Sequence, residues 1–174
     1  MEYTLFAGIH GVGKTTLINE LKKLLSITSL SISDLIRKSG NNIPTNEKFT
    51  KDINQNQELW KEELRKLSFA EEESVFLDGH FTLLDHEGEI VKLPFSTFEG
   101  INLNKIILKI EEPEVIRERL ERRDQKKWDV KLITEFQNVE VKRAQEFSKL
   151  KDIPLFIYES NSQKSNLEAF VNQI

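Results

Sequence analysis

The stretch that decides the fold is residues 3–17, Tyr3-Thr4-Leu5-Phe6-Ala7-Gly8-Ile9-His10-Gly11-Val12-Gly13-Lys14-Thr15-Thr16-Leu17. From Gly8 to Thr15 it spells G-x-x-x-x-G-K-T, the pattern of a phosphate-binding loop (P-loop). An apolar run suited to a buried strand precedes the loop, and a helical apolar face follows it at Leu17, Ile18, Leu21, Leu24 and Leu25. Because strand, loop and helix occur in the required order, we interpret the stretch as a functional P-loop rather than a glycine-rich turn.

Each part of the loop meets a demand of a nucleoside triphosphate. The glycines permit the positive φ angles and close approach by which backbone N–H groups converge on phosphate oxygens. Lys14 would supply a point charge to the β- and γ-phosphates, the Thr15 hydroxyl would be a ligand for Mg²⁺, and Thr16 would donate to the α-phosphate. The loop thus predicts binding of ATP with Mg²⁺ by Gly8, Gly11, Val12, Gly13, Lys14, Thr15 and Thr16. His10 is interpreted as a spacer.

Composition limits the remaining possibilities. A length of 174 residues fits one domain with one core, and 38% hydrophobic with 31% charged residues describes a globular protein. The net charge of −4 favours neither an anionic membrane nor an extended nucleic acid as a partner. The chain has no cysteine, shows no signal-peptide pattern and lacks an apolar run of the roughly 20 residues that cross a bilayer, so we expect a cytoplasmic protein.

A second signal of a nucleotide site is an acidic residue that follows the apolar strand at residues 74–77. The strand ends in Asp78-Gly79-His80, and an acidic residue at this place is the usual companion of a P-loop. Open parallel sheets bind their ligands at the carboxyl edge, so Asp78 is predicted to hold Mg²⁺ together with Thr15. The alternative is an ordinary Asp-Gly turn. For His80, orienting a substrate and filling the turn remain equally open.

An arginine cluster lies on the helix that begins at Pro113. Arg119 and Arg123 are four residues apart and share a helical face, so both guanidinium groups can converge on one polyphosphate. Phosphoryl transfer requires cationic groups to offset spreading negative charge, and the loop supplies only one lysine. We therefore predict catalytic roles for Lys14, Asp78, Arg119 and Arg123, the alternative being that this helix face is solvated.

The rest of the chain alternates strands with helices. Strands are predicted at 26–33, 103–110 and 154–158, and helices at 33–38, 59–67, about 132–150 and 166–172. Residues 41–56 are predicted to be a mobile, solvated excursion, and 81–100 to be irregular and a candidate wall of the acceptor pocket. The alternation favours an α/β fold of three αβα layers with a parallel sheet.

These features together resemble a known family. The P-loop, the segment Ser33-Asp34-Leu35-Ile36-Arg37, the triplet Asp78-Gly79-His80, and Pro113-x5-Arg119-x3-Arg123 are similar to nucleoside monophosphate kinases. The chain most resembles adenylate kinase of the short-lid archaeal type, which carries Asp-x-His. The resemblance implies a single P-loop kinase domain over 1–174, a five-stranded parallel sheet in the order 2-3-1-4-5, an acceptor-binding insertion at about 32–68 and a short lid at about 122–131.

The resemblance also implies roles for residues outside the loop. Arg37 would hold the phosphate of the acceptor, and Arg143 would reach the transferred phosphoryl group. The substrate-binding residues implied are Ser33, Asp34, Arg37, His80 and Arg143. The chain departs from the family at Ile32-Ser33, which replaces Thr-Gly, and at Phe81-Thr82, which replaces Pro-Arg.

The expected activity is transfer of the ATP γ-phosphoryl group to a nucleoside monophosphate, AMP first. Closure of residues near 124–130 and 41–56 would exclude water. Two alternatives stay open: a P-loop kinase for another acceptor, such as a nucleoside, a sugar, a cofactor precursor or a polynucleotide end, and a nucleotide-binding regulatory ATPase. If the acceptor is a hydroxyl, Asp78 is the leading candidate for a general base.

Overall fold

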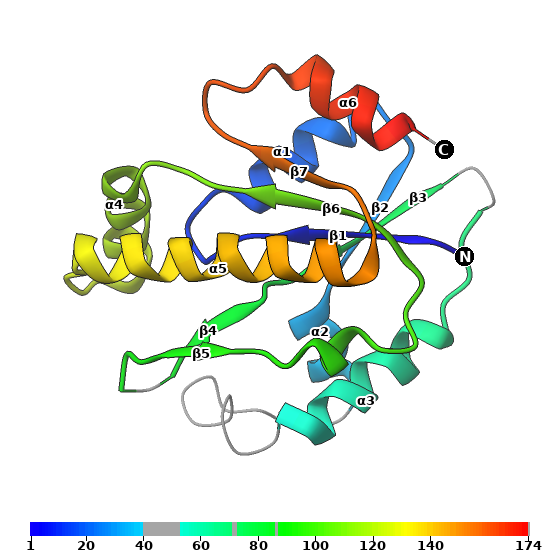
Figure 1. Cartoon of the computed structure of the whole chain (residues 1–174), viewed down its shortest axis with the longest axis horizontal. Helices are drawn as coiled ribbons and strands as arrows, with labels where there is room; N and C mark the ends of the chain where they lie inside the picture. Colours follow the sequence, from blue (N-terminus) through cyan, green and yellow to red (C-terminus); the bar gives the residue numbers. More distant parts are fainter. Residues whose placement is uncertain (40–52, 71–72, 86, 174) are drawn as a thin grey trace.

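The centre of the molecule is a parallel β-sheet (Figure 1). The computed structural model describes residues 1–39, 53–70, 73–85 and 87–173. Within them the sheet has the order β2-β3-β1-β6-β7, formed by β1 (Tyr3–Ala7), β2 (Ile27–Ser31), β3 (Ser74–Asp78), β6 (Leu103–Lys109) and β7 (Leu155–Tyr158). The predicted α/β class is confirmed. The labels differ from the predicted 2-3-1-4-5 because a separate two-stranded hairpin, β4–β5, precedes β6 in the chain.

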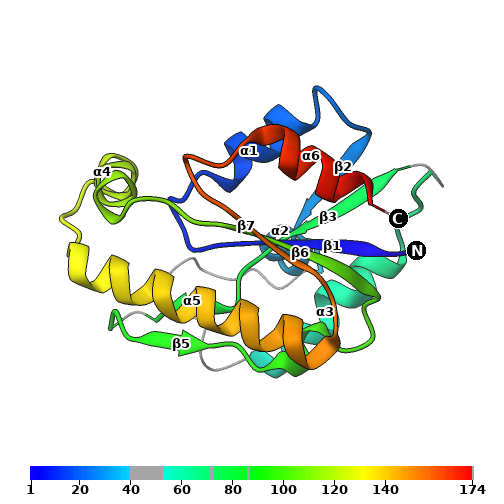
Figure 2. The same cartoon turned by 45° about the horizontal axis from the view of Figure 1, so that its top comes forward.

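Helices cover both faces of the sheet. They are α1 (Lys14–Leu21), α2 (Ile32–Lys38), α3 (Ile53–Arg65), α4 (Pro113–Asp124), α5 (Val130–Lys151) and α6 (Lys164–Asn172). Helices α1 and α6 lie on one face, α2, α3 and α5 lie on the other, and α4 stands beyond one end of the strands (Figures 1 and 2). Side chains alternate along β1, so Leu5 packs in the core beside α5 and Phe6 packs in the core beside α1 and α6.

A cluster of aromatic rings joins α5 to the segment that follows β3. Phe147 of α5 lies with its ring centroid 5.4 Å from those of Phe81 and Phe98 and 5.1 Å from that of Phe95. Edge-to-face pairs at these separations stabilise a core beyond the burial of their area. The cluster therefore fixes the chain between β3 and β6 against the long helix.

The prediction that residues 81–100 are irregular was wrong in part. It contains β4 (Thr82–Leu84), β5 (Ile90–Lys92) and a 3₁₀ turn, η1 (Phe95–Phe98). The hairpin turn is held by Asp85, whose Oδ1 accepts from the backbone N–H groups of Glu87 and Glu89, each at 2.9 Å. Each strand has three residues, too few to show a two-residue alternation in the sequence.

Three boundaries also differ from those predicted. Helix α1 ends at Leu21, and Leu24 is 58% exposed rather than on the buried face. The N-cap of α2 is Ser31, whose hydroxyl accepts from the N–H of Asp34 at 3.3 Å, so the helix begins at Ile32. Of the excursion predicted at 41–56, residues 41–52 lie outside the described residues and 53–56 belong to α3.

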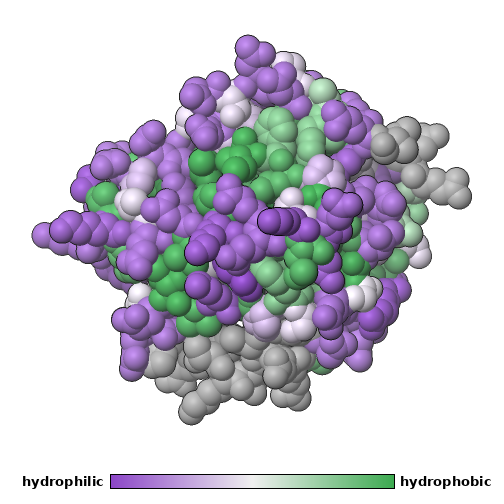
Figure 3. Space-filling model, in the orientation of Figure 1, coloured by the Kyte–Doolittle hydropathy of each residue, from purple (hydrophilic) through white to green (hydrophobic). Residues whose placement is uncertain are grey.

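No helix among residues 1–39, 53–70, 73–85 and 87–173 is long and apolar enough to cross a bilayer. Hydrophilic residues cover most of the face shown in Figure 3, with smaller hydrophobic areas between them.

Replacement of Phe147 by alanine tests the aromatic cluster. Because the side chain is 1% exposed, Phe147→Ala should lower the free energy of unfolding by about 3–5 kcal/mol. Leu150→Ala, on the same helix but 63% exposed, should cost less than about 0.5 kcal/mol. Urea denaturation followed by circular dichroism measures both values, and equal losses would contradict the packing described.

Candidate functional site

The P-loop connects the end of β1 to the start of α1. At Gly8, φ is 138°, and a Cβ atom there would lie 2.5 Å from the carbonyl oxygen of Lys109, so no other residue fits without movement. Gly13, with φ 92° and ψ 28°, is the left-handed N-cap of α1. The loop therefore turns back over the helix N-terminus, where backbone N–H groups and the helix dipole favour an anion.

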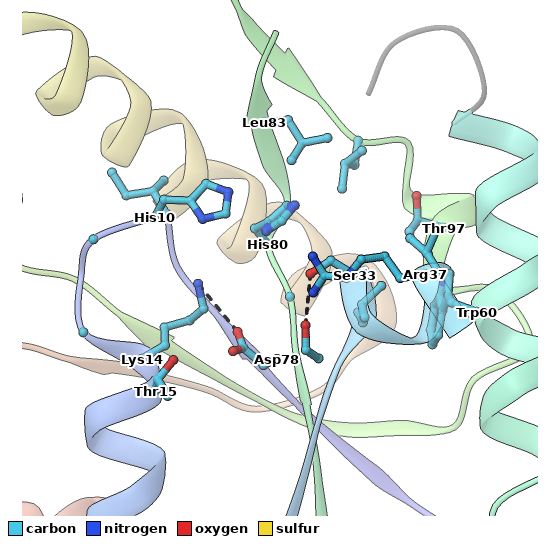
Figure 4. A pocket seen from close by; sticks show the side chains of 18 of the residues that line it. His10, Lys14, Thr15, Ser33, Arg37, Trp60, Asp78, His80, Leu83 and Thr97 are labelled. Atoms are coloured by element: carbon cyan, nitrogen blue, oxygen red, sulfur yellow. Dashed lines mark hydrogen bonds and ion pairs between the residues drawn. The ribbon is translucent and has the colours of Figure 1, made fainter. Parts of the chain in front are cut away.

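Lys14 extends back across the loop. Its Nζ donates to the carbonyl oxygen of Gly8 at 2.5 Å and lies 3.6 Å from Oδ1 of Asp78. Lys14 begins α1, just after the loop that leaves β1, and Asp78 ends β3. The two side chains meet because β1 and β3 are parallel neighbours, with Phe6 paired with Asp78 in register. Lysine and aspartate thus stand together at the carboxyl edge of the sheet (Figure 4).

The Asp78 carboxyl has a perturbed pKa. Burial raises its pKa above the ordinary value, while the ammonium of Lys14 opposes the shift. Thr15, in the first turn of α1, lines the same cavity. A hydroxyl and a carboxylate are hard oxygen donors of the kind that Mg²⁺ prefers, so these two residues fit the ion that a P-loop domain typically uses.

Two histidine rings face the same space. The ring centroids of His10 and His80 are 5.4 Å apart. Burial, aided by the charges of Lys14 and Arg123, lowers the pKa of His10 to about 4, and burial lowers the pKa of His80 well below 6.5. Both rings are therefore neutral at pH 7 and act there as hydrogen-bonding groups rather than cations. His10, interpreted from the sequence as a spacer, lines the cavity.

The two arginines of α4 also reach this cavity. The guanidinium of Arg119 donates to the carbonyl oxygen of Gly11 at 3.2 Å and to Glu111 at 3.3 Å. That of Arg123 donates to Asp124 at 2.5 and 2.9 Å. Both side chains are about half exposed, at 43% and 56%, so they have freedom to turn toward a bound anion.

At the opposite end of the cavity lies the helix α2. Ser33 and Arg37 line it, and Arg37 forms an ion pair with Asp34 one turn before. Asp34 is not among the lining residues. The resemblance implied that Asp34 binds a substrate. In this structure Asp34 instead contacts Arg37, which lines the cavity.

Much of the remaining wall is apolar, and part of it comes from residues 81–100, the segment expected to form a wall of the acceptor pocket. The cavity, of about 510 Å³, is bounded there by Ile32, Ile36, Trp60, Leu83, Leu93 and Phe98, with Thr97 beside them. These residues come from α2, α3, the hairpin region and η1, and Figure 4 shows how several of them surround one space. The helix predicted at 59–67 contains Trp60, but nothing in the spacing distinguishes a lining residue from a core residue.

Arg143 is not among the residues that line the cavity. Its Nη2 donates to the carbonyl oxygen of Leu93 at 2.7 Å, its Nη1 donates to Glu146 at 3.2 Å, and its guanidinium carbon lies 3.7 Å from the ring centroid of Phe95. The side chain thus ties α5 to the segment after β5 and lies outside the cavity lining in this structure.

A comparison with protein families agrees with this geometry. A family model described as an AAA domain matches residues 7–137, a range that includes the P-loop, Asp78 and both arginines of α4. The chain belongs to this family. It is a nucleotide-binding P-loop domain of the NTPase and kinase-like type. A search of curated proteins found no match.

Loss of the Lys14 ammonium tests the nucleotide site. Lys14→Ala should weaken binding of a non-hydrolysable ATP analogue by about tenfold or more, because the loop loses its only side-chain cation. Lys23→Ala, an exposed lysine just beyond α1, should bind normally. Calorimetric titration measures both affinities, and unchanged circular dichroism establishes that the variants are folded. Equal affinities would contradict this site.

The pKa of His10 predicts an acid-dependent loss of stability. Because its folded-state pKa of about 4 lies below the ordinary 6.5, the unfolded chain binds the proton more tightly. The contribution of neutral His10 is complete above about pH 6.5 and declines as the pH falls toward 4. Thermal denaturation should therefore show a smaller loss over this range for His10→Gln than for the wild type. Parallel curves would contradict the shift.

Proposed function

We propose that the protein is an ATP-dependent kinase that transfers the γ-phosphoryl group to a small acceptor bound in the same cavity. The supporting observation is that one cavity runs from the P-loop to Arg37 and Trp60. A volume of about 510 Å³ is within the range of small-molecule sites. A domain that only sensed a nucleotide would need the loop but not a second, cationic end facing it.

The acceptor that suits this space best is a nucleoside monophosphate, with AMP the first to test. Arg37 offers a planar guanidinium for a phosphate, and the Asp34 carboxylate restrains it. Beyond it, the ring of Trp60 and the side chains of Ile36 and Phe98 offer an apolar surface for a flat base. The similarity of Ser33–Arg37 to an acceptor motif supports the same choice.

The mechanism follows from charge and position. Transfer between phosphate oxygens needs little covalent participation by the protein, so its work is to align donor and acceptor and to offset negative charge. Lys14, Arg119 and Arg123 supply positive charge around the loop, while the histidines remain neutral. Thr15 and Asp78 would hold Mg²⁺, which would supply further positive charge there.

A hydroxyl acceptor is the second candidate, and one observation favours it. The pKa of Asp78 is raised by burial, which brings the carboxylate closer to the basicity that a general base needs. In that case Asp78 would accept the proton of the attacking hydroxyl. Nucleosides, sugars and cofactor precursors belong to this class.

A panel of acceptors tests the proposal. The protein is incubated with ATP and Mg²⁺ and with nucleoside monophosphates, nucleosides or small alcohols, and ADP and the phosphorylated product are both measured. The expected result is product with nucleoside monophosphates. Product with alcohols alone would select the second candidate, and ADP formation independent of any acceptor would indicate a regulatory ATPase.

Arg37 should contribute to binding of the acceptor and not to binding of ATP. Arg37→Ala should raise the KM of the acceptor by about 10- to 100-fold and that of ATP by less than about threefold, because the guanidinium faces only the acceptor end. Lys38→Ala, the next residue on the exposed side of α2, serves as the control. Steady-state kinetics with each substrate varied separately gives both constants. Equal effects on the two KM values would place Arg37 elsewhere.

Arg119 and Arg123 should act on the transition state. Alanine at either position should lower kcat by about tenfold or more with a smaller change in nucleotide affinity, because spreading phosphoryl charge would lose a cation. Arg122→Ala, on the same turn of α4 but outside the cavity lining, is the matched control. An unchanged kcat would mean that this helix face is merely solvated.

A further inference from the structure

Glu140 is a charged residue in a place where charge is costly. It lies in the middle of α5, and its side chain is completely buried, with 0% exposure. Among the described residues it forms no ion pair within 4.0 Å, and the ammonium of Lys14 acts on it only through space. Removing a carboxylate from water without a paired cation costs several kcal/mol, so an apolar residue would pack there at less cost.

Two donors converge on the Glu140 carboxylate. The backbone N–H of Phe81 donates to Oε1 at 2.9 Å and to Oε2 at 3.0 Å, and the hydroxyl of Thr82 donates to Oε2 at 2.5 Å. The backbone N–H of Gly8 contributes a further interaction. Burial raises the pKa of Glu140, whereas these donors and Lys14 lower it. The contacts offset part of the desolvation cost and fix the direction of each donor.

The donors belong to the two segments that form the reaction site. Phe81 and Thr82 follow directly on the turn Asp78-Gly79-His80, which faces the cavity. Gly8 begins the P-loop, and its carbonyl oxygen accepts the Lys14 ammonium. A single carboxylate on a 22-residue helix is therefore hydrogen-bonded to the segment after the turn and also interacts with the first residue of the P-loop.

We propose that Glu140 is a positioning residue that holds the Asp78–His80 turn in place against the P-loop. It touches no substrate and acts through the backbone that carries Asp78 and His80. Its loss would let the turn shift, and small displacements at a site that depends on alignment lower the rate of transfer more than the affinity. The effect on the rate rests on the proposed kinase activity, whereas the hold on the turn does not.

The test uses changes of graded severity. Glu140→Gln keeps the shape but removes the charge, Thr82→Val removes one donor, and Thr82→Ser restores the hydroxyl. The control is Phe170→Leu, a buried position on the opposite face of the sheet, which loses packing alone. The readouts are kcat, the KM of ATP, the melting temperature, and hydrogen exchange at the Phe81 amide.

We expect Glu140→Gln to lower kcat by about 10- to 100-fold and to change the KM of ATP by less than about threefold. Thr82→Val should have a smaller effect of the same kind, and Thr82→Ser should behave as the wild type. A loss of kcat in Glu140→Gln no larger than that of Phe170→Leu at a similar melting temperature would overturn the proposal, as would equal behaviour of the two Thr82 variants.

Hydrogen exchange tests the role of Glu140 without a substrate. Exchange at the Phe81 amide should be about tenfold faster in Glu140→Gln than in Phe170→Leu, because only the first variant weakens the acceptor of that N–H. Exchange equal in the two variants would overturn the role of Glu140. If the wild type phosphorylates no acceptor, the kinase proposal fails while this measurement still decides on Glu140.

Discussion

The site depends on the parallel pairing of β1 with β3. In this register Phe6 lies beside Asp78, so the residues that follow each strand emerge at the same edge. The P-loop leaves one strand there and the Asp78–His80 turn leaves the other, which brings Lys14 within 3.6 Å of Asp78 across 64 positions of sequence. Without that pairing, the loop would bind phosphates but would face no acidic partner.

Charge is distributed unevenly over the molecule. The whole chain carries a net charge of −4, yet the cavity is lined by Lys14, Arg37, Arg119 and Arg123. The histidines add no charge at pH 7 because burial and Lys14 lower their pKa values. A local excess of cations in a mostly acidic protein favours small polyanions over extended ones, which fits a metabolite better than a long nucleic acid.

The sequence predicted well what depends on local pattern. The P-loop, the alternation of strands with helices, and the acidic residue that ends β3 can each be recognised from a few neighbouring residues. The hairpin escaped prediction because three-residue strands show no periodicity. The place of Trp60 in the cavity wall and the buried position of Glu140 escaped prediction because both depend on packing between distant segments. The contact of Arg143 with Leu93 escaped prediction as well, since helix α5 gives no local sign of where the guanidinium turns.

The central claim is that donor and acceptor occupy one continuous cavity. It is tested most directly by calorimetric titration with a bisubstrate analogue, two nucleosides joined by a chain of phosphates. The account predicts that each protein molecule binds a single analogue, with an affinity about 100-fold or more above that of ATP, since the second end binds without a second loss of translational freedom. Two analogues bound per molecule, or an affinity no greater than that of ATP, would contradict it.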